Sequence, residues 1–395
     1  MYDSDLSPKR RLDAGRGLGN AHYVDQATYE LERQQLLFAQ WSGIGFAADV
    51  PNRGDVKPID FMGMPLLLVR DHEGEIGLFQ NTCRHRGMIL VHEATHIRRV
   101  IRCPYHSWCY DLRGELKATP HVGGPGRNSH EAIRLDDLGL VRIRAGEFLG
   151  VVFANISGNA LSFDQSIAHL KSRWADFDQD VFCGTESSST LNVRTNWKLA
   201  VENYCESYHL PWIHPGLNAY SKLADHYNID DRPGYSGQGT RVYRQLGVEG
   251  GIRFPDFDGI SDAWDTAGEY VSLFPNVLLG VHRDHCFAMV LKPVGMDHTV
   301  EHLRLFYTEE AASEERFAPL RRENLNLWSV VFNEDISVVE GMQRGRQGIY
   351  FDGGHFSPVM DASTAVFHRW VAQTLDDACS PEPIQTQALI DARTR

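Results

Sequence analysis

The alternation of hydrophobic and polar positions divides the chain into a helical segment, a β-rich part and a longer part that mixes strands with helices. Residues 25–40 place apolar side chains such as Tyr29 and Leu36 at helical spacing among charged residues, which predicts a helix. From Trp41 onward, glycine and proline separate short apolar runs, a pattern typical of a small antiparallel sandwich or barrel. The predicted strands are 43–50, 65–70, 76–82, 100–103, 141–145 and 148–153, with a hairpin at 111–116.

The remaining part of the chain is predicted to contain strands followed by long helices. Residues 1–24 are rich in charge and glycine and are predicted to be poorly ordered, while residues 218–267 give no assignment. The order of elements favours an α+β fold with a short N-terminal segment (1–40) and two domains (41–155 and 156–395). The expected helices are 168–177, 313–346 and 362–375, and the expected strands are 186–194, 270–274, 277–281, 286–293 and 299–307.

Charge and composition exclude several classes of partner. The 395 residues carry a net charge of −13, which argues against nucleic acid and anionic membrane surfaces as partners. No apolar run reaches the length of a membrane span, and the polar, acidic start lacks the layout of a signal peptide. Seven cysteines are too few, and odd in number, for a disulfide framework, so a reducing cytoplasm is expected.

Two short motifs in the β-rich part each supply one cysteine and one histidine. Cys83-Arg84-His85 is followed, after 17 residues, by Cys103-Pro104-Tyr105-His106. An ordinary zinc finger supplies two cysteines and then two histidines, so zinc remains the weaker alternative. The alternation suits a 2Fe–2S cluster with two thiolates (Cys83, Cys103) on one iron and two imidazoles (His85, His106) on the other. Cys109 is expected to be a core or loop thiol.

A second motif begins at Asn196 and combines acidic residues with histidines. Glu202, Glu206 and His209 recur at i, i+4 and i+7, which predicts that they share one helical face. Pro211 is predicted to end this helix just after His209. Two imidazoles, His209 and His214, together with a carboxylate from elsewhere would form a non-haem ferrous site. A histidine pair taken alone is more often a pair of core or surface residues.

The two motifs, in this order, resemble those of the α-subunits of Rieske non-haem iron oxygenases over roughly residues 39–347. The resemblance implies an all-β Rieske domain inserted ahead of a helix-grip, START-like catalytic domain whose antiparallel sheet is flanked by helices. Met88 and Tyr105 stand where respiratory Rieske proteins carry extra cysteines, which is similar to the oxygenase type. The resemblance assigns Cys83, His85, Cys103 and His106 to the cluster and His209, His214 and Asp335 to the catalytic iron.

The resemblance also implies further roles and partners. Asp335 is preferred over its neighbour Glu334 as the third iron ligand, Asn203 is expected near the open iron position, and Glu206 is expected to link the two metal sites across a head-to-tail homotrimer. Such enzymes activate O2 at Fe(II) with electrons from NADH or NADPH. No strand followed by Gly-x-Gly-x-x-Gly occurs, so a separate flavin and iron–sulfur reductase is expected as partner.

Glu206, in place of aspartate, and residues 340–345 are similar to the branch that includes carnitine and betaine oxygenases. The expected reaction is hydroxylation or N-dealkylation of a small quaternary-ammonium or amine substrate. The alternatives are an aromatic-ring dioxygenase, a Rieske electron carrier without catalysis, and a lipid-carrying or regulatory protein that has lost the iron. Aromatic side chains would suit a cationic substrate, although aromatics in such strands and helices are more often core residues. The candidates are Tyr204, Tyr208, Tyr220, Phe274, Phe287 and Phe332.

Overall fold

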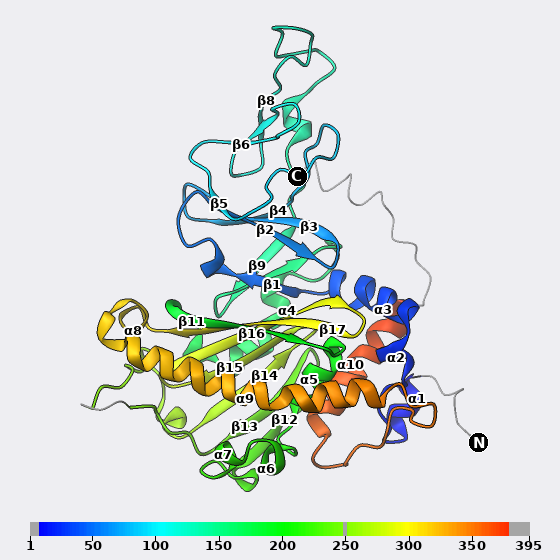
Figure 1. Ribbon diagram of the computed structural model, residues 1–395, viewed down its shortest axis with the longest axis vertical. Helices are drawn as coiled ribbons and strands as arrows, with labels where there is room; N and C mark the ends of the chain where they lie inside the picture. The colour runs from blue at the N-terminus through cyan, green and yellow to red at the C-terminus, as the bar shows by residue number, and fades with distance from the viewer. Residues whose placement is uncertain (1–7, 248–250, 379–395) are drawn as a thin grey trace. The chain divides into compact units, whose positions relative to one another are not determined.

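A computed structural model describes residues 8–247 and 251–378 of the chain. The chain divides into two compact units (Figure 1). One, here called the β unit, comprises Ile44–Ile156. The other, the mixed unit, is formed by the described residues before and after it. None of the described helices is both long and apolar enough to cross a membrane.

The β unit consists of small sheets and loops. Its core contains Val56, Leu67, Phe79, Trp108 and Tyr110, all buried. Strand pairing follows the orders β4-β3-β2-β5, β6-β7-β8 and β1-β10-β9. The strands are β1 (Ser42–Phe46), β2 (Asp55–Phe61), β3 (Met64–Arg70), β4 (Ile76–Gln80), β5 (Thr95–His96), β6 (Ile101–Arg102), β7 (Cys109–Tyr110), β8 (Leu116–Ala118), β9 (Arg144–Phe148) and β10 (Val151–Asn155).

The mixed unit is built on one antiparallel sheet of seven strands in the order β11-β17-β16-β15-β14-β13-β12. Strands β12 to β17 follow one another as a meander, and β11 pairs with β17 at the edge. The strands are β11 (Phe182–Val193), β12 (His226–Ile229), β13 (Tyr235–Thr240), β14 (Gly268–Leu273), β15 (Val277–His282), β16 (His285–Gly295) and β17 (His298–Tyr307).

Helices cover this sheet, and the longest of them, α9, runs across it (Figure 1). The N-terminal helices lie beside α10, at the other end of the chain. The α+β fold predicted from the sequence is confirmed. The helices are α1 (Pro8–Asp13), α2 (Ala21–Val24), α3 (Gln26–Glu32), α4 (Phe163–Arg173), α5 (Trp197–Cys205), α6 (Leu210–Ile213), α7 (Pro215–Asn218), α8 (Glu309–Ser313), α9 (Ala318–Gly345) and α10 (Ala362–Ala378).

The prediction of a poorly ordered N-terminus is wrong for residues 8–24, which form α1, α2 and the turn between them; residues 1–7 lie outside the described part. Contacts with distant parts of the chain hold this segment in place. Arg11 pairs with Asp352 at 2.6 Å, and the backbone N–H of Leu18 donates to Nδ1 of His368 at 3.0 Å. The charge and glycine content of this segment suggested disorder. Composition could not reveal these contacts, because the partners are more than 300 residues away in the sequence.

Candidate metal centres

Three side chains of the mixed unit converge on one point. Nε2 of His214 lies 3.2 Å from Nε2 of His209 and 3.1 Å from Oδ1 of Asp335. The same Asp335 oxygen lies 3.8 Å from His209 Nε2. Across residues 8–247 and 251–378, this is the one group of histidine, cysteine and carboxylate side chains spaced to hold a single metal ion. His209, His214 and Asp335 are here called the metal-ligating group. Two imidazoles and one carboxylate leave coordination positions open, as in non-haem ferrous sites.

The other ring nitrogens show which atoms are available to a metal. His209 Nδ1 lies 2.6 Å from Oε1 of Glu206, and His214 Nδ1 lies 2.7 Å from Oε2 of Glu334. Because an ionised carboxylate only accepts hydrogen bonds, each Nδ1 carries a proton. An imidazole that carries its proton on Nδ1 offers Nε2 to a metal, and both Nε2 atoms lie on the side of Asp335.

Helix α5 ends earlier than the sequence pattern predicts. Its last residue is Cys205, and Glu206 is extended, with φ −127° and ψ 159°. The prediction that Glu202, Glu206 and His209 share one helical face is therefore wrong. The carboxylate of Glu206 accepts hydrogen bonds from the backbone N–H groups of Tyr208 and His209. It thus caps the turn that follows and competes with continuation of the helix.

The predicted role of Pro211 is also wrong. It does not end the helix that precedes His209, because it lies in the first turn of the separate helix α6. Proline is tolerated there because the N–H groups of a first turn have no intrahelical acceptor. The break between α5 and α6 brings His209 and His214 together, since their five-residue spacing would separate them on one regular helix.

Helix α9 supplies both carboxylates that meet His214. Successive side chains on a helix are separated by roughly 100° around the axis. Asp335 therefore faces the Nε2 atoms, while Glu334 contacts Nδ1 of the same imidazole. The sequence had left these neighbours as competitors for one role, and the structure gives them different atoms of one ring.

The carboxylates also set the proton affinity of His214. Burial alone would lower its pKa, but the hydrogen bonds and charges of Asp335 and Glu334 outweigh burial and raise the pKa above its ordinary value. A metal cation bound at Nε2 would take the place of a proton there. Metal binding and proton release are therefore coupled at this residue.

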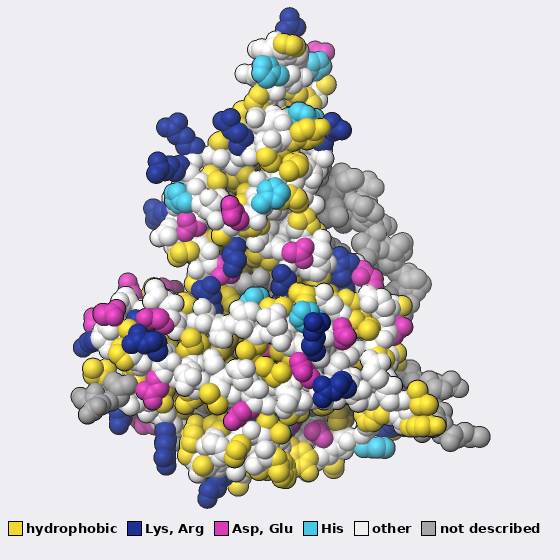
Figure 2. Space-filling view, in the orientation of Figure 1, with side chains coloured by type: hydrophobic (Ala, Val, Ile, Leu, Met, Phe, Trp, Pro, Cys, Tyr) yellow, Lys and Arg dark blue, Asp and Glu magenta, His cyan; other side chains and the backbone are white. Residues whose placement is uncertain are grey.

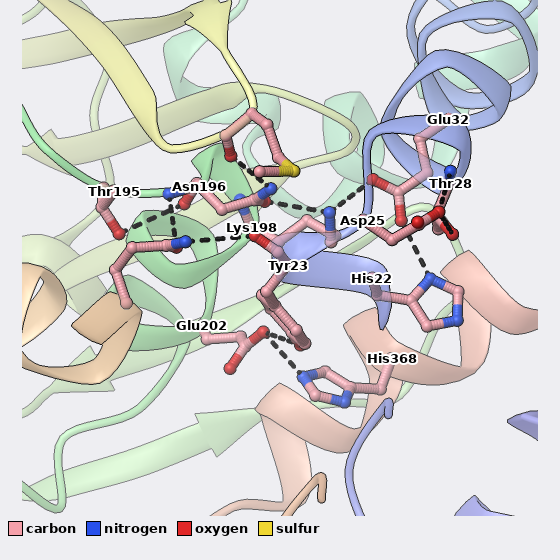
Figure 3. Close-up of polar contacts among 12 residues, drawn as sticks. His22, Tyr23, Asp25, Thr28, Glu32, Thr195, Asn196, Lys198, Glu202 and His368 are labelled. Atoms are coloured by element: carbon pink, nitrogen blue, oxygen red, sulfur yellow. Dashed lines mark hydrogen bonds and ion pairs between the residues drawn. The ribbon is translucent and has the colours of Figure 1, made fainter. Parts of the chain in front are cut away.

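The side of α5 that carries Glu202 faces a buried charged network instead of the metal-ligating group (Figure 3). Glu202 accepts a hydrogen bond from Tyr23, and its Oε1 lies 3.1 Å from Nε2 of His368. One turn earlier, Lys198 pairs with Glu32, and both side chains are fully buried. Burial alone would raise the pKa of Glu202, but His368 and then Arg346 outweigh burial and lower it. This network fixes α5 against the N-terminal segment and α10.

Two adjoining cavities lie in this part of the mixed unit, and one of them borders the metal-ligating group. The first, here called the inner cavity, has a volume of about 50 Å³ and is bordered by His209, His214 and Asp335. Its other walls include Asn203, Tyr204, Tyr270, Trp328 and Phe332. The second, called the outer chamber, has a volume of about 190 Å³ and shares Tyr270 and Trp328 with the first. Its polar lining consists of Tyr220, Tyr243, Arg244, Gln245, His282, His285 and Asn324.

The aromatic residues singled out in the sequence lie in different places. Tyr204 and Phe332 line the inner cavity with their rings nearly parallel, 6.4 Å apart, and Tyr220 lines the outer chamber. Phe287 packs behind the inner wall, 4.4 Å from the Trp328 ring. Phe274 packs against Phe367 and Trp370 in the core and borders neither cavity.

Tyr208 lies at the surface. Its side chain packs beside Trp212, and the two residues are 43% and 69% exposed. Figure 2 shows hydrophobic side chains gathered over α6, which contains Trp212, and over α7. Two wall residues, Tyr270 and Trp328, were missed from the sequence. Nothing in the local pattern distinguishes them from core aromatics, because their exposure to a cavity depends on how strand and helix pack.

A third, smaller cavity of about 20 Å³ contains a buried carboxyl group. Glu301 on β17 borders it together with Asn203 and Asp335, and the remaining walls are mostly apolar. Among the residues that the structure describes, none donates a hydrogen bond to Glu301 or forms an ion pair with it. Burial, followed by the charge of Asp335, raises the pKa of Glu301 to about 8. No local pattern in the sequence singled out Glu301.

The cysteine–histidine motifs of the β unit form two loops of the same design. The backbone N–H of Cys83 donates to the carbonyl oxygen of Met88, and that of Cys103 donates to the carbonyl oxygen of Trp108, both at 2.8 Å. The fourth residue after each cysteine, Gly87 or Ser107, has positive φ and donates its N–H back to the cysteine carbonyl. The two loops therefore share one backbone hydrogen-bond pattern around their cysteines.

These loops fit a cluster better than a single ion. The ring centroids of His85 and His106 lie 4.7 Å apart, and Nδ1 of His106 is buried without a hydrogen-bond partner among the described residues. Burial raises the pKa of Cys83, and neighbouring Cys103 raises it further. The hydrogen bond with the Tyr110 hydroxyl opposes this increase. Within the described ranges, the four side chains do not gather around one point, as tetrahedral zinc would require. A thiolate pair and an imidazole pair suit the two irons of a 2Fe–2S cluster.

Comparison with known proteins identifies both regions. The family described as "Ring hydroxylating alpha subunit (catalytic domain)" matches residues 182–377, and the "Rieske [2Fe-2S] domain" matches residues 40–134. The carnitine monooxygenase oxygenase subunit of Escherichia coli K12 is 25% identical over 371 residues, covering 90% of this chain and 92% of that protein. The glycine betaine monooxygenase oxygenase subunit of Chromohalobacter salexigens is 23% identical over 408 residues, covering 94% and 89%.

A solved structure agrees in fold. The quaternary ammonium Rieske monooxygenase CntA in complex with L-carnitine superposes with a TM-score of 0.74 at 20% identity, covering 93% of this chain and 99% of that chain. An electron carrier without catalysis would not match a catalytic domain after the Rieske domain, so that alternative is wrong. The matches likewise identify an oxidoreductase instead of a lipid-carrying or regulatory protein.

Proposed function

Because the chain belongs to the oxygenase α-subunits of the Rieske non-haem iron oxygenases, we propose that it hydroxylates or N-dealkylates a small quaternary-ammonium or amine substrate. The observation that carries this proposal is the aromatic wall of the inner cavity, formed by Tyr204, Tyr270, Trp328 and Phe332. A trimethylammonium group gains roughly 0.5–2 kcal/mol from each such ring. Carnitine and glycine betaine, named for enzymes among the relatives, both contain such a group.

The residues of the two centres then take defined roles. We assign the mononuclear iron to His209, His214 and Asp335, and the cluster to Cys83, His85, Cys103 and His106. The metals, when bound, supply oxygen activation at the mononuclear site and single electrons from the cluster. Glu206 and Glu334 hold protons on the two Nδ1 atoms and so keep both Nε2 atoms free. Asn203 and the aromatic walls orient the substrate and exclude water.

Electrons reach an oxygenase subunit of this family from a reductase partner. We propose that this partner carries flavin and an iron–sulfur centre and uses NADH or NADPH. We also propose a head-to-tail homotrimer in which Glu206 links the cluster of one subunit to the iron of the next. The carboxylate of Glu206 already contacts His209, the end of such a link on the iron side. The proposed Rieske domain is 41–155, and 1–40 with 156–395 form the catalytic part.

A substrate screen tests the function. Oxygen uptake should be recorded with a surrogate reductase for trimethylammonium compounds and for their uncharged tert-butyl analogues, which match them in shape. We expect uptake and released aldehyde or hydroxylated product with the cations, at least tenfold above the analogues. Equal rates with both would contradict recognition of the positive charge, and no uptake with any amine would overturn the proposal.

An aromatic-ring dioxygenase is the second candidate. The matching family is described by ring hydroxylation, and walls such as Tyr204 and Phe332 can also stack on a planar substrate. Product analysis separates the two functions, since a ring dioxygenase gives a cis-diol and an N-dealkylating enzyme releases an aldehyde. The same screen should therefore include naphthalene and biphenyl.

A further inference from the structure

Two aromatic rings form the boundary between the inner cavity and the outer chamber. Tyr270 on β14 and Trp328 on α9 line both spaces, and their ring centroids lie 5.8 Å apart. Trp328 precedes Asp335 by two helical turns, which places it roughly 10 Å from that residue along the helix axis. A substrate that reaches from the metal-ligating group into the outer chamber must therefore pass these rings.

A chain of hydrogen bonds fixes the Trp328 ring. Its Nε1–H lies 3.0 Å from Nε2 of His285, and Nδ1 of His285 lies 2.8 Å from Oδ1 of Asp284. The indole N–H can only donate, so His285 Nε2 accepts and the proton sits on Nδ1, where it is donated to Asp284. The hydroxyl of Tyr243 donates to the same Asp284 oxygen at 2.7 Å.

This chain is protected from solvent. Trp328 is 5% exposed, His285 is 2% exposed and Asp284 is fully buried. A buried indole N–H without an acceptor is destabilising, which favours the one ring orientation that meets His285. The orientation of Trp328 therefore depends on two residues that touch neither the metal-ligating group nor the inner cavity.

The second ring is held by the same hairpin. The hydroxyl of Tyr270 lies 3.1 Å from Nε2 of His282, and the rings of His282 and His285 are stacked with centroids 4.5 Å apart. Burial lowers the pKa of His282 well below its ordinary value, so its ring is neutral. The turn between β15 and β16 thus presents two histidines, one behind each boundary ring.

We propose that Asp284 and His285 are positioning residues that select substrates by length, by fixing Trp328 at the passage between the two cavities. The inference rests on the proposed function and specifies its substrate. The favoured substrate has a trimethylammonium end in the inner cavity and a polar tail in the outer chamber, among groups such as Tyr243, Arg244 and Asn324. A shorter cation stays in the inner cavity and does not reach the passage.

Glycine betaine and γ-butyrobetaine, which differ by two carbons in the spacer, are suitable short and long probes. The ratio of their kcat/KM values should be compared in the full-length holoenzyme and in the His285→Phe and His285→Gln variants. Phenylalanine removes both hydrogen bonds, whereas glutamine retains one acceptor for the indole and one donor for Asp284. We expect the long-to-short ratio to change at least tenfold in His285→Phe and to return within threefold of wild type in His285→Gln.

An unchanged ratio in a His285→Phe enzyme with normal iron and cluster content would overturn the inference, as would an equal change in both variants. If His285→Phe does not fold, Trp328→Phe tests the same point by removing the donor, with the same tenfold change expected. Failure of the proposed function is recognised separately, because wild-type enzyme would then oxidise neither probe. A crystal structure of His285→Gln and His285→Phe needs no substrate: an indole displaced only in the latter supports the inference, and one unmoved in both overturns it.

Discussion

Oε2 of Glu334 lies 2.7 Å from Nδ1 of His214, while Asp335, the next residue on α9, lies 3.1 Å from Nε2 of the same ring. Two adjacent carboxylates thus contact the two nitrogen atoms of one imidazole. The first fixes the tautomer and the second completes the metal-ligating group. The distinction gives the two neighbours different expected phenotypes.

Glu334→Ala should weaken ferrous iron binding by roughly 10–100-fold without abolishing it, because His214 loses the partner that orients its ring. Calorimetric titration of iron-free protein with Fe(II) under anaerobic conditions measures the change. Glu323→Ala is the matched control, since Glu323 is exposed on the same helix. Affinity equal to wild type in Glu334→Ala would show that the contact does not orient the ligand.

Asp335→Ala should empty the mononuclear site and leave the Rieske spectrum intact, since the cluster motifs lie in the other unit. Two imidazoles without a carboxylate bind ferrous iron poorly. Iron analysis should fall from about three to about two irons per chain. If Asp335→Ala retained the third iron while Glu334→Ala lost it, the ligand would be Glu334.

The cluster motifs could be predicted from the sequence because each loop contains its own cysteine, histidine and turn residue within a few positions. The mononuclear site was different. His209 and Asp335 are 126 residues apart, and only the resemblance to a family connected them. Their meeting depends on how α9 lies against the segment after α5, which no local pattern records.

The helix prediction from residue 196 failed for a physical reason. Glu202, Glu206 and His209 have helical spacing, but the side chain of Glu206 bonds to backbone N–H groups and caps a turn. Periodicity cannot separate a capping carboxylate from one on a helical face. The wall residues Tyr270 and Trp328 were missed for a related reason, because burial against a cavity and burial in a core look alike in the sequence.

Glu206→Gln should keep both metals but lower steady-state turnover by roughly 10–100-fold. Glutamine can still accept from His209 Nδ1, but it lacks the charge of the carboxylate and the second acceptor oxygen that meets the backbone N–H groups of Tyr208 and His209. Single-turnover reoxidation of a pre-reduced cluster, with iron and substrate loaded, measures the step directly. A wild-type rate with normal product yield would exclude Glu206 as the link between the centres.

Cys83→Ser should abolish the visible charge-transfer absorption of the cluster, because thiolate donation to ferric iron produces it. Cys109→Ser is the matched control in the same unit, since Cys109 is also buried but directs its thiol to the carbonyl oxygen of Ser107. We expect full colour and acid-labile sulfide in the control and none in Cys83→Ser. Colour that persists in a folded Cys83→Ser protein would contradict the cluster assignment.

Glu301 should make the stability of the iron-free protein depend on pH. Its pKa is raised from 4.5 to about 8 in the folded protein, so folding favours the protonated form. The resulting stabilisation is present in full below pH 4.5 and is lost as the pH rises through about 8. The loss across this window should be on the order of 3–5 kcal/mol, since each pKa unit corresponds to about 1.4 kcal/mol.

Glu301→Gln should remove this dependence, because the amide keeps the volume of the side chain and does not titrate. Calorimetric unfolding of the catalytic part should be followed from pH 5 to 9 in iron-free wild type and variant. We expect the variant to gain stability relative to wild type as the pH rises, with the gain levelling off above pH 8. Asp335 is the charged neighbour at this cavity, so Asp335→Asn should shift the midpoint of that gain to lower pH. Parallel curves for wild type and Glu301→Gln would show that the carboxyl group is not held protonated by burial.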